Sequence, residues 1–163
     1  MVIAIVSDTH LPRGKRRLPD EVLERAGSAD LVVHAGDFTD AAALAAFEGV
    51  GTDLRAVHGN MDQPAVFERL PDMLSFDVEG IRLGMVHDPG PRNGRLDRLR
   101  KRFPDCDAVI FGHTHQPQHD QEEDFQIFNP GSPTEHRGRW RSHTMGMARV
   151  EGAAIGFELV ELD

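Results

Sequence analysis

Seven aspartate, asparagine and histidine side chains in this sequence could together hold metal ions. They form five short groups, and each group closely follows an apolar run typical of a buried strand: Asp8 with His10, Asp37, Asn60, His87, and His113 with His115. In open α/β sheets, ligands bind at the carboxyl ends of the strands. The sequence therefore predicts that seven oxygen and nitrogen ligands converge, which is enough for two divalent metal ions that share a ligand.

The residue types favour transition metals over Mg²⁺ and Ca²⁺, which prefer oxygen ligands alone. Asp8 and His10 are two residues apart, as are His113 and His115, and residues at that spacing in an extended segment point the same way. Asp37 has two carboxylate oxygens and is the predicted bridge. We expect Mn, with Fe, Zn or Ni as alternatives. Two such ions about 3.5–4 Å apart can clamp a phosphoryl group and ionise a bridging water.

The elements that position these residues change pattern midway along the chain. Strands are expected at 2–6, 30–34, 53–57, 74–78, 82–86, 108–111, 125–128, 140–150 and 154–162. Helices or helical turns are expected at 19–26, 40–47, 63–70 and 96–103. The segment 116–123 has no clear pattern. Strand–helix alternation followed by antiparallel hairpins predicts two sheets packed face to face, with helices outside.

Composition narrows the class of protein. A length of 163 residues predicts a single domain over 1–163. The net charge of −9 argues against a protein that coats nucleic acid. Cys106 is the only cysteine, which excludes an intrachain disulfide. No apolar run is long enough to cross a membrane, and the first strand begins without a basic leader, so we expect a cytoplasmic protein.

In their order along the chain, the five groups resemble the calcineurin-like metallophosphoesterase superfamily, in particular its small single-domain phosphodiesterase branch. The matching motifs are Asp8-x-His10, Gly36-Asp37, Gly59-Asn60, His87, Gly112-His113-x-His115 and the turn Asn129-Pro130-Gly131-Ser132. The resemblance implies an α/β fold, namely a four-layer αββα sandwich of two mixed β-sheets flanked by helices. It assigns one metal to Asp8, His10, Asp37 and His115. It assigns the second to Asp37, Asn60, His87 and His113.

Asn60 and Asp62 are the candidate catalytic residues. Many larger members of the superfamily carry histidine directly after the asparagine, where it assists the leaving group, but this chain has Met61. Because methionine cannot donate a proton, we expect activated diesters to be cleaved better than alkyl monoesters. Asp62 is not expected to replace the acid, since an exposed carboxyl group is ionised near neutral pH.

Arg13 and His136 are the candidate residues at the substrate rim. Arg13 belongs to a basic run with Lys15, Arg16 and Arg17, which either steers phosphate or is a solvated loop. His136 follows the turn at 129–132. His34 and His58 are expected to be packed histidines near the site.

The sequence thus predicts a dinuclear-metal-dependent phosphoesterase. The leading prediction is a phosphodiesterase that hydrolyses a small phosphate ester through a metal-bridging hydroxide. One alternative is a non-catalytic protein-binding scaffold of the same fold, against which the seven intact ligands argue. Another is a nuclease, but the chain has no clear basic stripe, so nucleic acid is a disfavoured partner. A homo-oligomer is compatible with the sequence.

Overall fold

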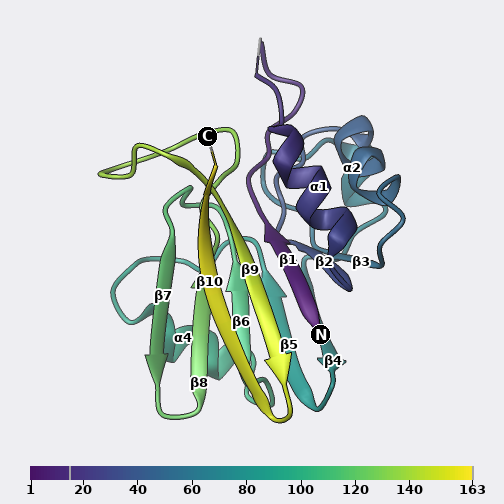
Figure 1. Cartoon of the computed structure of the whole chain (residues 1–163). Coiled ribbons are helices and arrows are strands. Elements are labelled where there is room, and N and C mark those ends of the chain that lie inside the picture. Colours follow the sequence, from purple (N-terminus) through teal and green to yellow (C-terminus); the bar gives the residue numbers. More distant parts are fainter. Residues whose placement is uncertain (15, 163) are drawn as a thin grey trace.

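Two mixed five-stranded sheets form the centre of the molecule (Figure 1). The structure is a computed structural model and describes residues 1–14 and 16–162. The first sheet contains β1 (Val2–Val6), β2 (Leu31–His34), β3 (Leu54–Ala56), β9 (His143–Glu151) and β10 (Ala154–Leu162), in the order β10-β9-β1-β2-β3. The second contains β4 (Met73–Val78), β5 (Ile81–Val86), β6 (Ala108–Phe111), β7 (Gln118–Glu122) and β8 (Phe125–Asn129), in the order β4-β5-β6-β8-β7.

Alternating side chains on the strands build a core on each face of the sheets. On β1, Ile3 and Ile5 face the second sheet, where they join a cluster that includes Leu83 and Ile110. Ala4 and Val6 are buried in another cluster, with residues of α1 (Asp20–Ser28), α2 (Ala41–Glu48) and α3 (Pro64–Phe67). This is the two-residue periodicity of a strand buried on both faces.

The far side of the second sheet is covered by α4 (Arg95–Arg102), whose Leu99 packs with Val109 and Phe111 of that sheet. The layers are therefore helices, first sheet, second sheet, helix (Figure 1). The predicted four-layer αββα sandwich is confirmed. Within the described ranges, no helix is both long and apolar enough to cross a membrane.

The parallel strands supply the edge that carries the candidate ligands. In the first sheet β1, β2 and β3 are parallel, and in the second β5, β6 and β8 are parallel. The predicted hairpin between β4 and β5 is present, and both of its turn residues are left-handed, Glu79 at φ 47° and Gly80 at φ 88°. Such a turn matches the twist of the strands that it joins.

Strand β7 is absent from the sequence-based prediction. Its residues are Gln-His-Asp-Gln-Glu, which show no alternation of apolar and polar side chains. β7 lies at the edge of the second sheet, where β8 is its one partner among the described strands. Polar and charged side chains are common on edge strands because they discourage pairing with another chain. The other strands were predicted to within three residues at each end, but α3 is a single turn and much shorter than 63–70.

Candidate metal centre

The loops after the parallel strands have unusual backbone conformations at the candidate ligands. Five of these residues are left-handed: Asp8 at φ 56°, His10 at φ 46°, Asp37 at φ 61°, His113 at φ 70° and His115 at φ 54°. This conformation costs a residue with a Cβ atom about 1–2 kcal/mol. Residues strained in this way cluster at functional sites. The expectation that the two pairs converge through extended backbone is therefore wrong, although the pairs do converge.

The turn that follows β8 holds two of these loops in place. The hydroxyl of Ser132 donates to the carbonyl of Asp8 at 2.7 Å, and the hydroxyl of Thr134 donates to the carbonyl of Thr9 at 2.8 Å. The side-chain amide of Asn129 donates to the carbonyl of Gly112 at 2.9 Å. The turn Asn129-Pro130-Gly131-Ser132 and the following Thr134 thus tie the first ligand loop to the last.

Glycine is required at two positions by close approach. Gly36 has φ 94°, and a Cβ there would lie 2.7 Å from Nδ1 of His87. A Cβ on Gly112 would overlap the hydroxyl oxygen of Ser7 and lie 2.8 Å from Oδ2 of Asp8. The absence of side chains at Gly36 and Gly112 therefore lets the ligand loops pack directly against one another.

Asp8, His10 and His115 form one buried triad, whose candidate ligand atoms lie within 4.8 Å of one another. The Nε2 atoms of His10 and His115 are 3.0 Å apart, and Nε2 of His115 is 3.2 Å from Oδ1 of Asp8. Two imidazole nitrogens at this distance cannot both present lone pairs unless a proton or a cation lies between them. The triad therefore fits a divalent metal ion.

Asp8, Asp37 and His87 form a second buried triad. The Nδ1 atom of His87 is 2.7 Å from the carbonyl oxygen of Ala35, which can only accept, so Nδ1 carries a proton. The Nε2 atom of His87 therefore faces the carboxylates, 3.3 Å from Oδ2 of Asp37. A backbone carbonyl that fixes the ring of a histidine in this way is typical of metal ligands.

Asp37 and Asn60 join the two groups. Oδ2 of Asp37 lies 3.5 Å from Nε2 of His10 and 3.3 Å from Nε2 of His87. Oδ1 of Asn60 lies 3.2 Å from Nε2 of His87 and 2.9 Å from Nδ1 of His113. All seven residues singled out in the sequence are thus brought together. The two triads share Asp8. Asp37 contacts a histidine on each side, namely His10 and His87.

Burial and opposite charges determine the protonation of the cluster. Burial lowers the pKa of His10, against the charges of Asp37 and Asp8. Burial also disfavours charge on His87, but its hydrogen bond to Asp37 and the charges of Asp8 and Asp37 raise its pKa to about 9. Burial alone would raise the pKa of Asp37. The hydrogen bond and the charge of His87 outweigh this effect and hold the pKa of that carboxyl below its usual value. Buried imidazoles and carboxylates that neutralise one another form a donor set suited to divalent transition metals.

Comparison with known proteins identifies the family of this chain. The calcineurin-like phosphoesterase superfamily domain matches residues 1–153. The chain belongs to the calcineurin-like phosphoesterase superfamily. A probable metallophosphoesterase of Methanothermobacter thermautotrophicus is 32% identical over 162 residues, covering 98% of this chain and 92% of the relative. The phosphodiesterase MJ0936 of Methanocaldococcus jannaschii is 27% identical over 147 residues, covering 80% and 83%. Zinc-bound Vps29 of Entamoeba histolytica shares the fold, with a TM-score of 0.78 at 17% identity over 99% of each chain.

Asp62 of this calcineurin-like phosphoesterase is buried, with 7% of its surface exposed, so the expectation of an exposed carboxyl is wrong. Its two oxygens accept from the backbone N–H groups of Gly59 at 2.7 Å, Thr39 at 2.7 Å and Asp37 at 3.2 Å. Burial raises its pKa, although these bonds oppose the shift. Asp62 holds the loops of Asp37 and Asn60 together, and its catalytic role stays a prediction.

Glu135 contacts the candidate centre but is not among the residues that the sequence singled out. Its Oε2 lies 2.6 Å from Nδ1 of His115, and its Oε1 lies 2.5 Å from Arg16 and 3.5 Å from Arg13. Oε2 of Glu135 and Nδ1 of His115 are close enough for an ion pair, but their geometry does not meet the angles of a hydrogen bond. Burial would raise the pKa of Glu135, but Arg16 and His115 lower it. Its only signal in the sequence is its place three residues after Ser132.

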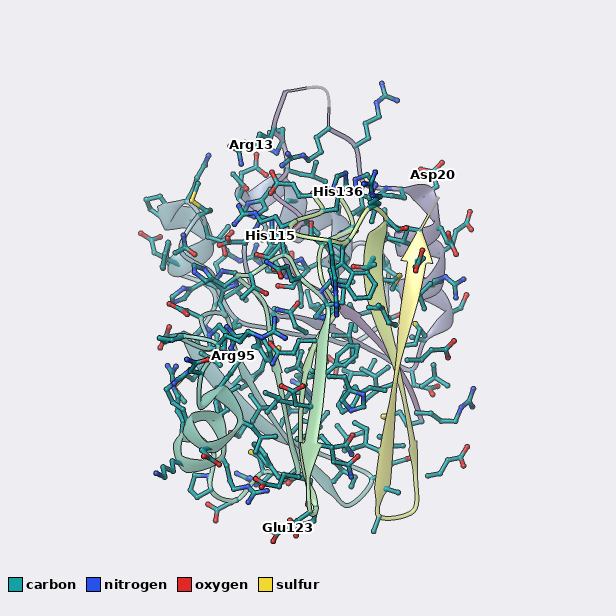
Figure 2. The ribbon with its side chains drawn as sticks, turned by 90° about the vertical axis from the view of Figure 1, so that its left-hand side faces the viewer. Arg13, Asp20, Arg95, His115, Glu123 and His136 are labelled. Atoms are coloured by element: carbon teal, nitrogen blue, oxygen red, sulfur yellow. The ribbon has the colours of Figure 1, made fainter. Side chains whose placement is uncertain are left out.

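The two predicted rim residues lie at the same end of the molecule as His115, far from Glu123 (Figure 2). Arg13 is 60% exposed and pairs with Glu135. His136 is exposed, and its ring centre is 5.8 Å from that of His143. Their roles toward a substrate stay predictions.

The packed histidines differ from the candidate ligands. His34 is fully buried and stacks on Phe38 at 3.6 Å, as expected of a core residue. Burial holds its pKa well below the usual value, and its Nδ1 accepts from the backbone N–H of Gly36 at 3.2 Å. His58 packs on Phe67 at 4.2 Å. His34 is therefore held neutral by the core.

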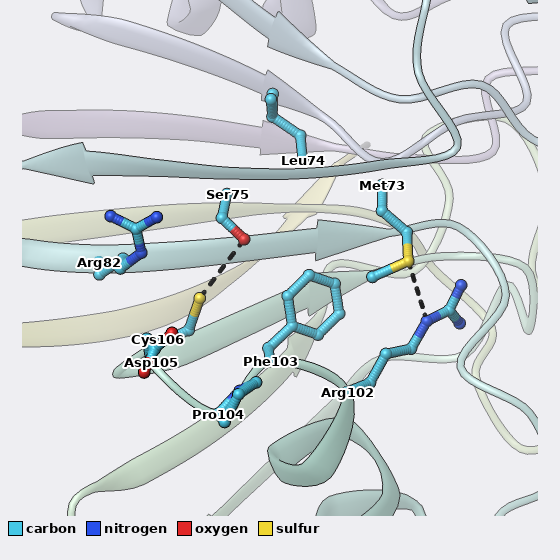
Figure 3. A pocket seen from close by; sticks show the side chains of 9 residues that line it. All are labelled: Met73, Leu74, Ser75, Arg82, Arg102, Phe103, Pro104, Asp105 and Cys106. Atoms are coloured by element: carbon cyan, nitrogen blue, oxygen red, sulfur yellow. Dashed lines mark hydrogen bonds between the residues drawn. The ribbon is translucent and has the colours of Figure 1, made fainter.

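A recess of about 170 Å³ lies away from the metal centre, on the outer face of the second sheet, between β4 and the end of α4 (Figure 3). The thiol of Cys106 lies 3.6 Å from the hydroxyl of Ser75, and Nε of Arg102 lies 3.1 Å from the sulfur of Met73. Burial raises the pKa of Cys106, which keeps the thiol protonated and a weak nucleophile. No group of candidate metal ligands occurs in the described lining of this recess.

Proposed function

We propose that the protein is a dinuclear-metal-dependent phosphodiesterase that hydrolyses a small phosphate ester. The observation that carries this proposal is the position of Asp37, whose Oδ2 lies between Nε2 of His10 and Nε2 of His87 at 3.5 and 3.3 Å. One carboxylate oxygen can therefore serve two neighbouring cation sites. Membership of the superfamily and the named activity of the M. jannaschii relative support the reaction type.

The proposed ligand sets are those that membership of the superfamily implies, and they draw on both buried triads together with Asn60 and His113. One ion is assigned to Asp8, His10, Asp37 and His115. The other is assigned to Asp37, Asn60, His87 and His113. The mixture of imidazole and carboxylate suits Mn, Fe or Zn, and the related Vps29 of E. histolytica has been crystallised with zinc. When bound, such ions supply positive charge to the phosphoryl group and lower the pKa of water.

The chain's own residues orient this chemistry. The bond from His87 to the carbonyl of Ala35 fixes the ring so that Nε2 points to Asp37. The side chain of Asn60 directs its oxygen to His87 and His113, which leaves its amide nitrogen to donate to a phosphoryl oxygen. Met61 is 51% exposed beside Asn60 and has no proton to give. The leaving group must therefore depart without an acid at that position.

The test compares three substrates with the protein loaded with Mn²⁺: an aryl diester, an aryl monoester and an alkyl monoester. The aryl diester should have the highest kcat/KM, because general acid help is worth about 10²- to 10⁴-fold only when the leaving group needs a proton. Met61→His should raise turnover of the alkyl ester. Metal-stripped protein is the control. The proposal fails if the loaded protein hydrolyses none of the three esters, or if metal analysis finds one ion per chain in excess Mn²⁺.

A further inference from the structure

Two loops beside the metal centre concentrate positive charge on an otherwise acidic protein. The chain has a net charge of −9, yet these loops carry six arginines: Arg13, Arg16, Arg17, Arg137, Arg139 and Arg141. The first loop follows β1 and the second joins β8 to β9. Figure 2 shows that the end of the molecule bearing Arg13 and His136 also bears His115.

Glu135 connects this arginine cluster to the metal centre. Its carboxylate lies 2.5 Å from Arg16, 3.5 Å from Arg13 and 3.8 Å from Arg137, and it also contacts His115 at 2.6 Å. A carboxylate has about four acceptor sites, whereas each guanidinium carries five N–H donors. Glu135 therefore satisfies only a fraction of the donors. The side chains of Arg13 and Arg137 are 60% and 55% exposed, so their remaining donors are accessible.

A recess of about 440 Å³ is lined by Arg16, Thr134, Glu135, His136, Arg137 and His143. Arg13 is not part of this lining but contacts Glu135 of the lining at 3.5 Å. Burial lowers the pKa of His143, and the charges of His136 and Arg16 lower it further. Apart from Glu135, the ionisable side chains of the lining are basic, namely Arg16, Arg137, His136 and His143. Glu135 links the recess to the metal centre, because it lines the recess and lies 2.6 Å from Nδ1 of His115, whose Nε2 is 3.2 Å from Asp8.

We propose that this recess binds a second phosphate group of the substrate, so that the substrate class is small phosphodiesters that carry an additional phosphate. The inference rests on the proposed function, since the metal centre would take the phosphate that is cleaved. Guanidinium forks match phosphate oxygens bidentately, which gives geometric selectivity as well as charge. Arg13 and Arg137 approach Glu135 from two different loops and are the residues assigned to hold this phosphate.

The binding test does not depend on turnover. Metal-free full-length protein is titrated with inorganic phosphate, while NMR follows the backbone amides of 133–137 and the ring of His136. We expect saturable shifts that are lost in the double variant Arg13→Ala, Arg137→Ala. The control Arg149→Ala removes an equally exposed arginine, 66% exposed on β9, and should keep them. Shifts that do not saturate, or that persist in the double variant, would overturn the proposal.

The kinetic test uses two p-nitrophenyl diesters that differ only by one additional phosphate. The additional phosphate should lower KM by about 10- to 100-fold in the wild type, as expected for charge-assisted hydrogen bonds of about 1.5–3 kcal/mol. The double variant should lose most of this preference, and Arg149→Ala should keep it. An equal KM for both esters in the wild type would refute the inference. If neither ester is cleaved but phosphate still binds the recess, the proposed function fails and the anion site stands.

Binding affinities for a series of phosphorylated oligonucleotides of increasing length distinguish a site for small esters from a site for nucleic acid. Affinity that does not change with oligonucleotide length supports a site for a single phosphate group. Affinity that rises steadily with length would overturn the assignment to small esters, because each added phosphate contact strengthens polyanion binding.

Discussion

The metal centre and the recess at Cys106 both bring polar side chains of distant segments together, but their polar atoms are used differently. At Cys106 the polar side chains pair with each other, and none of the residues that line the recess is left-handed. At the metal centre, four left-handed residues, Asp8, His10, Asp37 and His115, contribute buried imidazole and carboxylate atoms to groups whose members lie within 4.8 Å of one another. The contrast teaches that convergent ligand atoms on strained backbone distinguish a candidate site, whereas the presence of a hollow does not.

Of the variants considered, Asp37→Asn should cause the largest loss of activity. A small loss would contradict the contrast between the metal centre and the recess at Cys106. The substitution removes a negative charge that faces both His10 and His87. Loss of a residue that only supports a metal ligand typically costs about 10- to 100-fold, and the loss of kcat/KM should be larger than that. His58→Ala is the matched control, because His58 packs on Phe67 and should keep most of the activity. Equal losses in both variants, at equal Mn²⁺ content and stability, would contradict the role of Asp37.

Glu135→Gln should weaken metal binding by about 10- to 100-fold, because it removes the carboxylate that faces Nδ1 of His115. Competition with a chromophoric chelator measures Mn²⁺ affinity independently of activity. Glu123→Gln is the control, since Glu123 is 77% exposed and pairs with Arg100 away from the site. Unchanged affinity in Glu135→Gln would show that the arginines, and not the metal centre, are what Glu135 organises.

Gly112→Ala should lower the free energy of unfolding by about 1–3 kcal/mol, because the new Cβ would overlap Ser7 and crowd Asp8. Gly156→Ala on β10 has open space around it and should change stability by less than about 0.5 kcal/mol. Thermal or urea unfolding of the metal-free proteins measures both. A Gly112→Ala protein as stable as the wild type would mean that the ligand loops have room to separate.

Cys106→Ser should have the smallest effect on activity and metal affinity. It tests the comparison at the recess rather than at the metal centre. The thiol is protonated and contacts only Ser75 among the hydrogen-bonding groups of its described surroundings. We expect kcat/KM and Mn²⁺ affinity to stay within about twofold of the wild type, since surface-region substitutions away from a site usually have small effects. A tenfold fall in either quantity would place chemistry in the outer recess.

The strand ends and their polar groups could be predicted because each ligand closely follows an apolar run, as Asp8 follows β1 and His113 follows β6. What could not be predicted depends on contacts distant in sequence. Glu135 becomes important only when the loop after β8 folds back onto His115. Asp62 is buried only because backbone N–H groups of Gly59, Thr39 and Asp37 surround its carboxylate. The cytoplasmic location and any homo-oligomer stay predictions.

The bonds from Ser132 and Thr134 to the first ligand loop have a consequence for biosynthesis. They join residues separated by 124 and 125 positions in the sequence. During synthesis Asp8 and His10 leave the ribosome long before the turn that holds their loop, so the complete centre cannot form on the growing chain. Any metal ion that the proposed centre binds would therefore be acquired only when synthesis is nearly complete.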